Sequence, residues 1–317
     1  MPRHLIDITD LTVGEIDGLI ATAEDILSHP AAYQDACQRR QLATLFFEPS
    51  TRTRLSFESA MLSLGGSVLG FSSAQSSSAA KGETVGDTVR TVSCYADIIA
   101  MRHPREGAPY AAAQVSEVPV INAGDGGHNH PTQTLTDLLT LHREKGRLGG
   151  FTVGFCGDLK FGRTVHSLVN ALSRYGDIRY DFISPVELKL PRYVKEEALK
   201  KRGIPYSQTT DLEEVLPELD VLYMTRVQRE RFFNEEDYLR LKDSYVLTPA
   251  KLARARQDLS ILHPLPRVNE ITAAVDRDPR AAYWRQVRNG KFIRMALILL
   301  LLGLSPGNGG GEGVYEH

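Results

Sequence analysis

Short apolar runs alternate with longer stretches of helical periodicity along most of the chain. The apolar runs that are typical of strands fall at 42–48, 67–71, 97–103, 118–124, 151–158, 178–185, 220–226 and 259–266. Helical patterns lie between them at about 53–64, 83–95, 131–145, 162–175 and 191–202. This alternation indicates βαβ units with parallel sheets, and many of the runs are apolar throughout, as expected of strands covered on both faces. We therefore predict an α/β fold with two doubly wound domains, each with a mainly parallel central sheet flanked by helices.

Two breaks and an apolar end modify this pattern. The sequence "EKGRLGG" interrupts the alternation, so we place a domain boundary near residue 148. The Ser/Ala-rich segment 72–80 has the composition of a mobile loop. The run "MALILLLLGL" (295–304) is too short to cross a bilayer and indicates a buried terminal helix. The glycine-rich residues 305–317 are expected to be disordered.

The composition excludes several classes of protein. The 317 residues are 42% hydrophobic and 24% charged, which is typical of a globular protein with sizeable cores. A formal net charge of -2 provides no overall basic field, so we expect neither nucleic acid nor a membrane as a partner. The three cysteines lie far apart and form no CxxC pair, which argues against a disulfide framework and a zinc site. Because the N-terminus also has no apolar run of signal-peptide type, we expect a cytoplasmic protein.

The stretch "EPSTRTRLSFE" opens a predicted helix with an unusual charge pattern. Ser50 or Thr51 would make a good N-cap, because a side-chain oxygen there can accept a free backbone N–H. Arg52 and Arg54 follow in the first turn, where the helix dipole makes each cation unfavourable by roughly a few tenths of a kcal/mol. A bound phosphate would make both favourable, since free N–H groups and arginines bind anions. "GDLKFGRT" repeats the pattern around Arg163, so we predict two anion sites, one per domain.

Five predicted strands end next to six arginines, and a sixth strand ends before His130; ligands of open α/β sheets bind outside the carboxyl ends of the strands. These arginines are Arg52, Arg54, Arg102, Arg163, Arg226 and Arg267. Any one of them could be a solvated residue or a structural ion pair, but six at one edge favour an anion-binding cleft. His130 lies at the same edge, where it could be structural, although the adjacent Thr132 and Gln133 favour a functional site. "HPLPR" (263–267) is either a rigid turn or a source of fixed backbone carbonyls.

Six motifs in this order resemble those of one enzyme family, and they are "FEPSTRTRLSFE", "MRHP", "GDGGHNHPTQTLTDLLTL", "GDLKFGRTVHSL", "YMTRVQRERF" and "HPLPRVNEI". From about residue 4 to 304 the chain closely resembles the catalytic chains of the aspartate carbamoyltransferase family. Ornithine carbamoyltransferases share the "STRTR" and "HPxQ" pieces but typically have "HCLP" where this chain has "HPLP". The resemblance implies transfer of a carbamoyl group from carbamoyl phosphate to L-aspartate, without a metal or an organic cofactor. It further implies a carbamoyl-phosphate-binding domain (1–148), on which a helix at about 281–304 packs back, and an aspartate-binding domain (149–280).

The resemblance also assigns roles to individual residues. The phosphate would be held by Ser50, Thr51, Arg52 and Thr53. The carbonyl oxygen would be surrounded by Arg102, His130 and Thr53, at the point where charge develops in a tetrahedral transition state. The carbamoyl NH₂ would bind Gln133 and the backbone carbonyls of Leu265 and Pro266. The aspartate carboxylates would bind Arg163, Arg226 and Gln228.

The family forms trimers in which a loop of one subunit completes the site of its neighbour. The corresponding loop here is 72–80, followed by Lys81, which aligns through "KGET". Lys81 would therefore meet aspartate in the neighbouring subunit, whereas Ser77 aligns only loosely in the low-complexity part. The resemblance implies a homotrimer and leaves open whether a separate regulatory chain binds. Two alternatives are a carbamoyltransferase for another amine such as ornithine, and a non-catalytic anion-binding protein.

Overall fold

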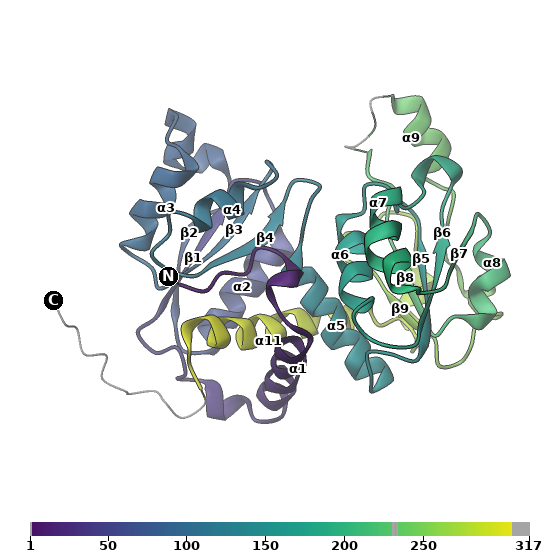
Figure 1. Cartoon of the computed structure of the whole chain (residues 1–317), viewed down its shortest axis with the longest axis horizontal. Helices are drawn as coiled ribbons and strands as arrows, with labels where there is room; N and C mark the ends of the chain where they lie inside the picture. The colour runs from purple at the N-terminus through teal and green to yellow at the C-terminus, as the bar shows by residue number, and fades with distance from the viewer. Residues whose placement is uncertain (1, 230–231, 233, 306–317) are drawn as a thin grey trace. The chain divides into compact units, whose positions relative to one another are not determined.

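The protein consists of two compact units (Figure 1). The structure is a computed structural model and describes residues 2–229, 232 and 234–305. Unit 1 comprises Met1–Leu135 with Asn289–His317, and unit 2 comprises Thr136–Arg288. The chain passes from one unit to the other inside helix α5 (Pro131–Lys145) and again inside helix α11 (Tyr283–Leu302). The sequence-based boundaries lie just outside these two helices, because breaks in a pattern mark the ends of helices rather than the points where packing partners change.

Unit 1 is built on a four-stranded parallel sheet in the order β2–β1–β3–β4. Its strands are β1 (Gln41–Phe46), β2 (Ser67–Phe71), β3 (Ile98–His103) and β4 (Val120–Asp125). Phe46 pairs with Arg102, so the carboxyl ends of β1 and β3 are level. This register brings the residues that follow the two strands to one edge of the sheet.

The two faces of this sheet are covered by different helices. The odd-numbered residues of β1 and β3 pack in one apolar cluster with α3 (Val85–Ser93) and α4 (Ala108–Ala113). Helices α1 (Val13–Ser28), α2 (Thr51–Ser63) and α11 lie on the other side (Figure 1). Arg294 of α11 donates to Ser56 Oγ at 3.0 Å and lies over the Phe57 ring. These contacts with α2 hold the C-terminal helix on unit 1.

Unit 2 is built on a five-stranded parallel sheet in the order β7–β6–β5–β8–β9. Its strands are β5 (Phe151–Cys156), β6 (Ile178–Ile183), β7 (Tyr206–Thr209), β8 (Val221–Met224) and β9 (Ser260–Leu262). Its helices include α6 (Arg163–Leu172), α7 (Arg192–Val194), α8 (Leu212–Val215), α9 (Glu235–Leu241) and α10 (Pro249–Leu252). An apolar core of residues from β5, β8 and β9 packs against α8 and α10.

The eight predicted strands are confirmed, and two parallel sheets flanked by helices give the predicted α/β class. Strand β7 was not predicted, because "YSQT" has no apolar run. Helix α1 was not predicted either, although Thr12 and Glu15 form a capping box at its start. Segment 72–80, interpreted as a mobile loop, contains two short 3₁₀ turns, η3 (Ala74–Ser76) and η4 (Ser78–Lys81). From residue 306 onward, the tail for which we predicted disorder lies outside the described residues.

Within the described residues, no helix combines the length and the apolar character that a membrane span requires.

Candidate functional site

The first turn of α2 carries the four residues that the sequence assigns to phosphate. Ser50 occupies the N-cap position, but its side chain makes no capping hydrogen bond, contrary to the expectation from sequence. The first backbone N–H groups of a helix have no partner within the helix, and this turn contains no acidic residue. Thr51 and Arg52 are exposed, whereas Thr53 is buried. An open pocket of about 290 Å³ beside the turn is lined by Pro49, Ser50, Thr51, Arg54, Leu55, Ser72 and Ser73.

Two of the six strand-end arginines, Arg54 and Arg267, form ion pairs with nearby acids of the chain. Arg54 donates from Nε to Glu58 Oε1 at 2.7 Å, one helical turn away. Arg267 forms a two-pronged pair with Asp276, and its guanidinium lies over the ring of Tyr283. The hydrogen bond from Arg267 lowers the pKa of Asp276 to about 2. These two arginines therefore neutralise acids of the protein, and neither is among the residues that the resemblance assigns to substrates.

Arg102 is buried at the end of β3 and is held by an acid that sequence analysis did not single out. Its Nη2 donates to Glu48 Oε1 at 2.8 Å, and its Nη1 lies 3.5 Å from the carbonyl oxygen of Ala123. Its Nε is buried and, among the residues that the structure describes, has no hydrogen-bond partner. Because a buried unpaired donor is costly, Arg102 Nε is suited to an oxygen of a ligand. Glu48 directly follows the apolar run of β1, and this position at a strand end was the only signal for it.

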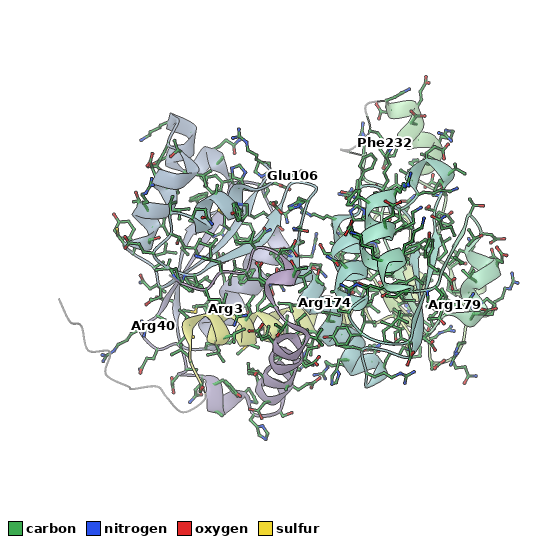
Figure 2. All side chains as sticks on the ribbon, viewed as in Figure 1. Arg3, Arg40, Glu106, Arg174, Arg179 and Phe232 are labelled. Carbon is green, nitrogen blue, oxygen red and sulfur yellow. The ribbon has the colours of Figure 1, made fainter. Side chains whose placement is uncertain are left out.

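The loop that leads to His130 is organised by the buried carboxylate of Asp125. Its Oδ1 accepts the Asn122 side-chain amide and the Asn129 backbone N–H, each at 3.0 Å. Its Oδ2 accepts the backbone N–H of Gly107, at the start of α4, at 2.9 Å. Figure 2 shows Glu106 in this same part of unit 1. Asp125 lies inside the "GDGG" motif, but the motif alone did not reveal its role.

His130 and Gln133 lie at the start of α5. The His130 side chain is buried, and the carbonyl oxygen of His130 accepts the backbone N–H groups of Gln133 at 3.0 Å and Thr134 at 3.2 Å. The hydroxyl of Thr132 lies 3.5 Å from His130 Nδ1. Gln133 is half-buried. His130 is therefore positioned by backbone bonds at the helix start, while Arg102 reaches the same edge from β3.

Lys81 ends turn η4 and is exposed. Among the described residues, no ion pair involves its ammonium group, so an incoming anion would meet no competing carboxylate there. Ser77 is half-buried, and its hydroxyl donates to the carbonyl oxygen of Ala74 at 2.8 Å.

In unit 2, the start of α6 and the segment after β8 are joined by one hydrogen bond. Arg163 is the first residue of α6, and its side chain is half-buried. A side chain at the preceding Gly162 would bring Cβ within 2.5 Å of the Asp158 carbonyl oxygen, so the turn requires glycine. Gln228 donates from Nε2 to the Phe161 carbonyl oxygen at 3.1 Å. Two of the predicted aspartate-binding residues, Arg163 and Gln228, are thereby tied to the same short loop.

Aromatic side chains support this region. Phe232 contacts Phe161 and Tyr238, with ring centroids 6.4 and 6.0 Å apart (Figure 2). An apolar cluster of Leu188, Val227 and Leu241 lies against the same rings. These contacts fix the backbone on either side of Arg163 and Gln228.

Leu265 and Pro266 lie in the turn after β9, as the sequence predicted. Leu265 adopts a φ of 56°, a left-handed conformation that is uncommon for a residue other than glycine. Arg226 is half-buried. Burial lowers the pKa of His263, at the start of this turn, and the charge of Arg226 lowers it further. Unit 2 therefore brings Arg226 to the same end of the sheet as the turn.

Nothing among these groups has the composition of a metal centre: within the described ranges, no set of three His, Cys, Asp or Glu residues could hold a metal ion. The arrangement is instead a set of cations and hydrogen-bond donors at the carboxyl ends of parallel strands.

Comparison with protein families also divides the chain into two domains, although its second domain includes the C-terminal helix that the structure assigns in part to unit 1. Residues 3–143 match the carbamoyl-phosphate-binding domain of aspartate/ornithine carbamoyltransferases. Residues 149–301 match the Asp/Orn-binding domain of the same family. Together the two matches cover both sheets.

Individual relatives are similar over nearly the whole chain. The aspartate carbamoyltransferase catalytic subunit of Lachnoclostridium phytofermentans is 62% identical over 304 residues, which cover 96% of this chain and 99% of that protein. The corresponding subunit of Clostridium acetobutylicum is 61% identical over 302 residues, covering 95% and 98%.

Solved structures have the same fold. The catalytic subunit of M. jannaschii aspartate transcarbamoylase superposes with a TM-score of 0.88 at 44% identity, covering 95% of this chain and 98% of that one. Aspartate transcarbamoylase from Trypanosoma cruzi in complex with carbamoyl phosphate and aspartate gives a TM-score of 0.88 at 39% identity, covering 94% and 96%. The chain therefore belongs to the aspartate/ornithine carbamoyltransferase family.

Proposed function

We propose that this chain transfers the carbamoyl group of carbamoyl phosphate to the amine of L-aspartate, which yields N-carbamoyl-L-aspartate and phosphate in pyrimidine biosynthesis. The observation that carries the proposal is the 62% identity, over nearly its full length, to a protein named as an aspartate carbamoyltransferase catalytic subunit. The three free cysteines suit a reducing compartment such as the cytoplasm.

Unit 1 supplies the groups for the phosphate and the reacting carbonyl. The phosphate binds at the start of α2, where the uncapped N–H groups and the exposed Arg52 stabilise its charge. As the carbonyl carbon becomes tetrahedral, its oxygen gains negative charge, and Arg102, His130 and the Thr53 hydroxyl stabilise it. The unpaired Nε of Arg102 supports this role. Gln133 binds the carbamoyl NH₂ through its side-chain oxygen.

Unit 2 supplies the acceptor site and two backbone carbonyls. Arg163, Arg226 and Gln228 bind the aspartate carboxylates, since guanidinium groups match carboxylates in a planar, two-pronged geometry. The carbonyl oxygens of Leu265 and Pro266 accept from the carbamoyl NH₂.

The reaction needs no covalent intermediate with the protein. The neutral amine of aspartate attacks the carbonyl carbon, the bond to the phosphate oxygen breaks, and the departing phosphate accepts the amine proton. Catalysis then consists of positioning the two substrates and stabilising charge.

The experiment that tests this function offers carbamoyl phosphate to the purified chain with L-aspartate and, separately, with L-ornithine. We expect phosphate release and carbamoyl-aspartate with aspartate alone. An ornithine side chain ends in a cation, which the guanidinium groups of Arg163 and Arg226 would repel. Turnover with ornithine at a rate equal to that with aspartate would contradict the assignment, and absence of turnover with both would favour a non-catalytic anion-binding protein.

We also propose that the chain forms a homotrimer in which Lys81 of one subunit completes the site of its neighbour. Two features of unit 1 support this. Lys81 is exposed at the end of η4, with no carboxylate of its own chain in an ion pair among the described residues. Leu55 and Leu62 are both 56% exposed on α2, and Leu55 lines the pocket beside Ser72 and Ser73. An exposed apolar stripe next to the site suits burial by a second subunit.

Mixing two inactive variants tests the shared site. Arg52→Ala and Lys81→Ala trimers should each be nearly inactive. After dissociation and reassociation of an equal mixture, about a quarter of the sites should combine an intact Arg52 with an intact Lys81 from the neighbouring subunit, with activity to match. Native mass spectrometry confirms that hybrids have formed. Hybrid trimers without recovered activity would show that each site belongs to a single subunit.

A further inference from the structure

His263 is the hub of a buried hydrogen-bond network in the turn after β9. Only 1% of it is exposed. Its Nδ1 lies 2.8 Å from the backbone nitrogen of Leu265, and its Nε2 lies 2.6 Å from Glu270 Oε1. Its own backbone N–H donates to Gln286 Oε1 at 2.9 Å. The backbone N–H and both ring nitrogens of His263 therefore form hydrogen bonds with other groups of the protein.

These contacts determine the tautomer of the imidazole. The backbone nitrogen of Leu265 can only donate, so Nδ1 must be the acceptor. Nε2 then carries the proton and donates it to the carboxylate of Glu270. The other oxygen of Glu270 accepts the backbone N–H groups of Val268 and Asn269, each at 3.1 Å. Burial lowers the pKa of His263, which keeps the imidazole neutral and its Nδ1 able to accept.

The hydrogen bond to Nδ1 comes from Leu265, a residue in an unfavourable backbone conformation. Leu265 has a φ of 56°, and a left-handed conformation is unfavourable for a residue with a Cβ. Such a conformation persists only when its surroundings hold it. The hydrogen bond from the Leu265 N–H to His263 is a contact that helps to hold it.

The network is anchored at its other end in the core of unit 2. Gln286 donates from Nε2 to Asp137 Oδ1 at 2.6 Å, and the Tyr223 hydroxyl donates to Asp137 Oδ2 at 2.8 Å. All three side chains are almost fully buried. The position of the His263 backbone is thus fixed by α5, β8 and α11, and not by the turn alone.

We propose that His263 is a positioning residue, which acts as a fixed neutral acceptor and aims the carbonyl groups of Leu265 and Pro266 at the carbamoyl NH₂. Glu270 selects its tautomer, and Gln286 fixes its backbone. This inference rests on the proposed function, because it gives these two carbonyl groups the role of binding the carbamoyl donor. It adds a residue that contacts no substrate.

Two substitutions test the hydrogen bonds of Nδ1 and Nε2 separately. In His263→Asn, the amide can place an oxygen near the position of Nδ1, so the bond from Leu265 N–H can persist while the bond to Glu270 is lost. In His263→Gln, the longer amide can reach Glu270 but places no acceptor at Nδ1. Leaving the buried Leu265 N–H unpaired should raise the KM for carbamoyl phosphate by about 10–100-fold in His263→Gln. His263→Asn should stay within about threefold of the wild type.

The comparison of kinetic constants distinguishes positioning from general stabilisation. The carbonyl groups contact the carbamoyl NH₂ both before and during the reaction, so kcat and the KM for aspartate should change much less than the KM for carbamoyl phosphate. The melting temperature of each variant is measured alongside. Equal KM values in the two variants, or a lower melting temperature with unchanged KM, would overturn the proposal.

A measurement on the unsubstituted protein covers the case in which a variant does not fold. In protein labelled with ¹⁵N-histidine, His263 should show the Nε2–H tautomer at neutral pH. Its signal is identified as the one that disappears in His263→Asn or, failing that variant, as the one that shifts most in Glu270→Gln. An imidazolium or an Nδ1–H tautomer would overturn the proposal. Because this readout does not depend on turnover, it separates a failure of the inference from a failure of the proposed function, which the wild-type assay with aspartate tests directly.

Discussion

Arg52→Ala should lower kcat by about 10²–10³-fold while leaving the fold intact. Arg52 is the exposed cation in the first turn of α2, where we propose that the phosphate leaves with its full charge. Its loss removes an interaction that strengthens in the transition state, so kcat should fall along with kcat/KM for carbamoyl phosphate. The unfolding free energy should stay constant or rise slightly, because a cation is removed from the positive end of a helix. Steady-state kinetics and thermal unfolding measure the two effects.

Arg54→Ala is the matched control, since it removes a guanidinium from the same turn of the same helix. Glu58 already neutralises Arg54, and Thr44 also donates to Glu58, at 3.0 Å. Loss of the Arg54 guanidinium should therefore reduce kcat less than about tenfold and cost at most ~1 kcal/mol of stability. If Arg54→Ala is as inactive as Arg52→Ala, the effect belongs to the charge of the helix start in general and not to Arg52.

Arg226→Ala should lower kcat/KM for aspartate by more than about 10²-fold, chiefly through a higher KM for aspartate. Arg226 is half-buried after β8, and a carboxylate desolvated beside it would lose its partner. The KM for carbamoyl phosphate should change little, because the residues that we assign to the phosphate lie on unit 1. Varying each substrate at saturation of the other separates the two KM values. Equal increases in both would remove Arg226 from the acceptor site.

Arg229→Ala is the control for Arg226. Arg229 lies three residues further along the chain and forms an ion pair with Glu235, in which both side chains are more than 60% exposed. Exposed pairs of this kind contribute little, so both KM values should stay within about twofold of the wild type. A rise in the KM for aspartate in Arg229→Ala would mean that this segment has a diffuse positive field and no single carboxylate-binding residue.

The sequence predicted the two sheets well because most of their strands, unlike β2 and β7, are buried on both faces. A strand such as β1 or β5 must then be apolar at nearly every position, and that requirement is visible without any tertiary information. Helix α5 was also predicted, with the bounds that the structure has, because Pro131 marks its first turn. Strand β7 is instead mostly polar, and none of its residues is fully buried. Its place in the sheet depends on its neighbour β6, which the local pattern does not contain.

The sequence also determined which residue types gather at the strand ends, but not which of them are available to a ligand. The pairing of Arg54 with Glu58 follows helical spacing, whereas Arg102 meets Glu48 across 54 residues and His263 meets Glu270 through a turn. Parallel strands bring such distant residues together only after the sheet has formed and its register is set. An ion pair or a buried hydrogen bond depends on distances of about 3 Å between side chains, and the order of residues along the chain does not fix those distances. The tertiary structure therefore decided that Arg54 and Arg267 neutralise acids of the protein itself, and that a buried histidine holds the turn whose carbonyl groups we assign to the substrate.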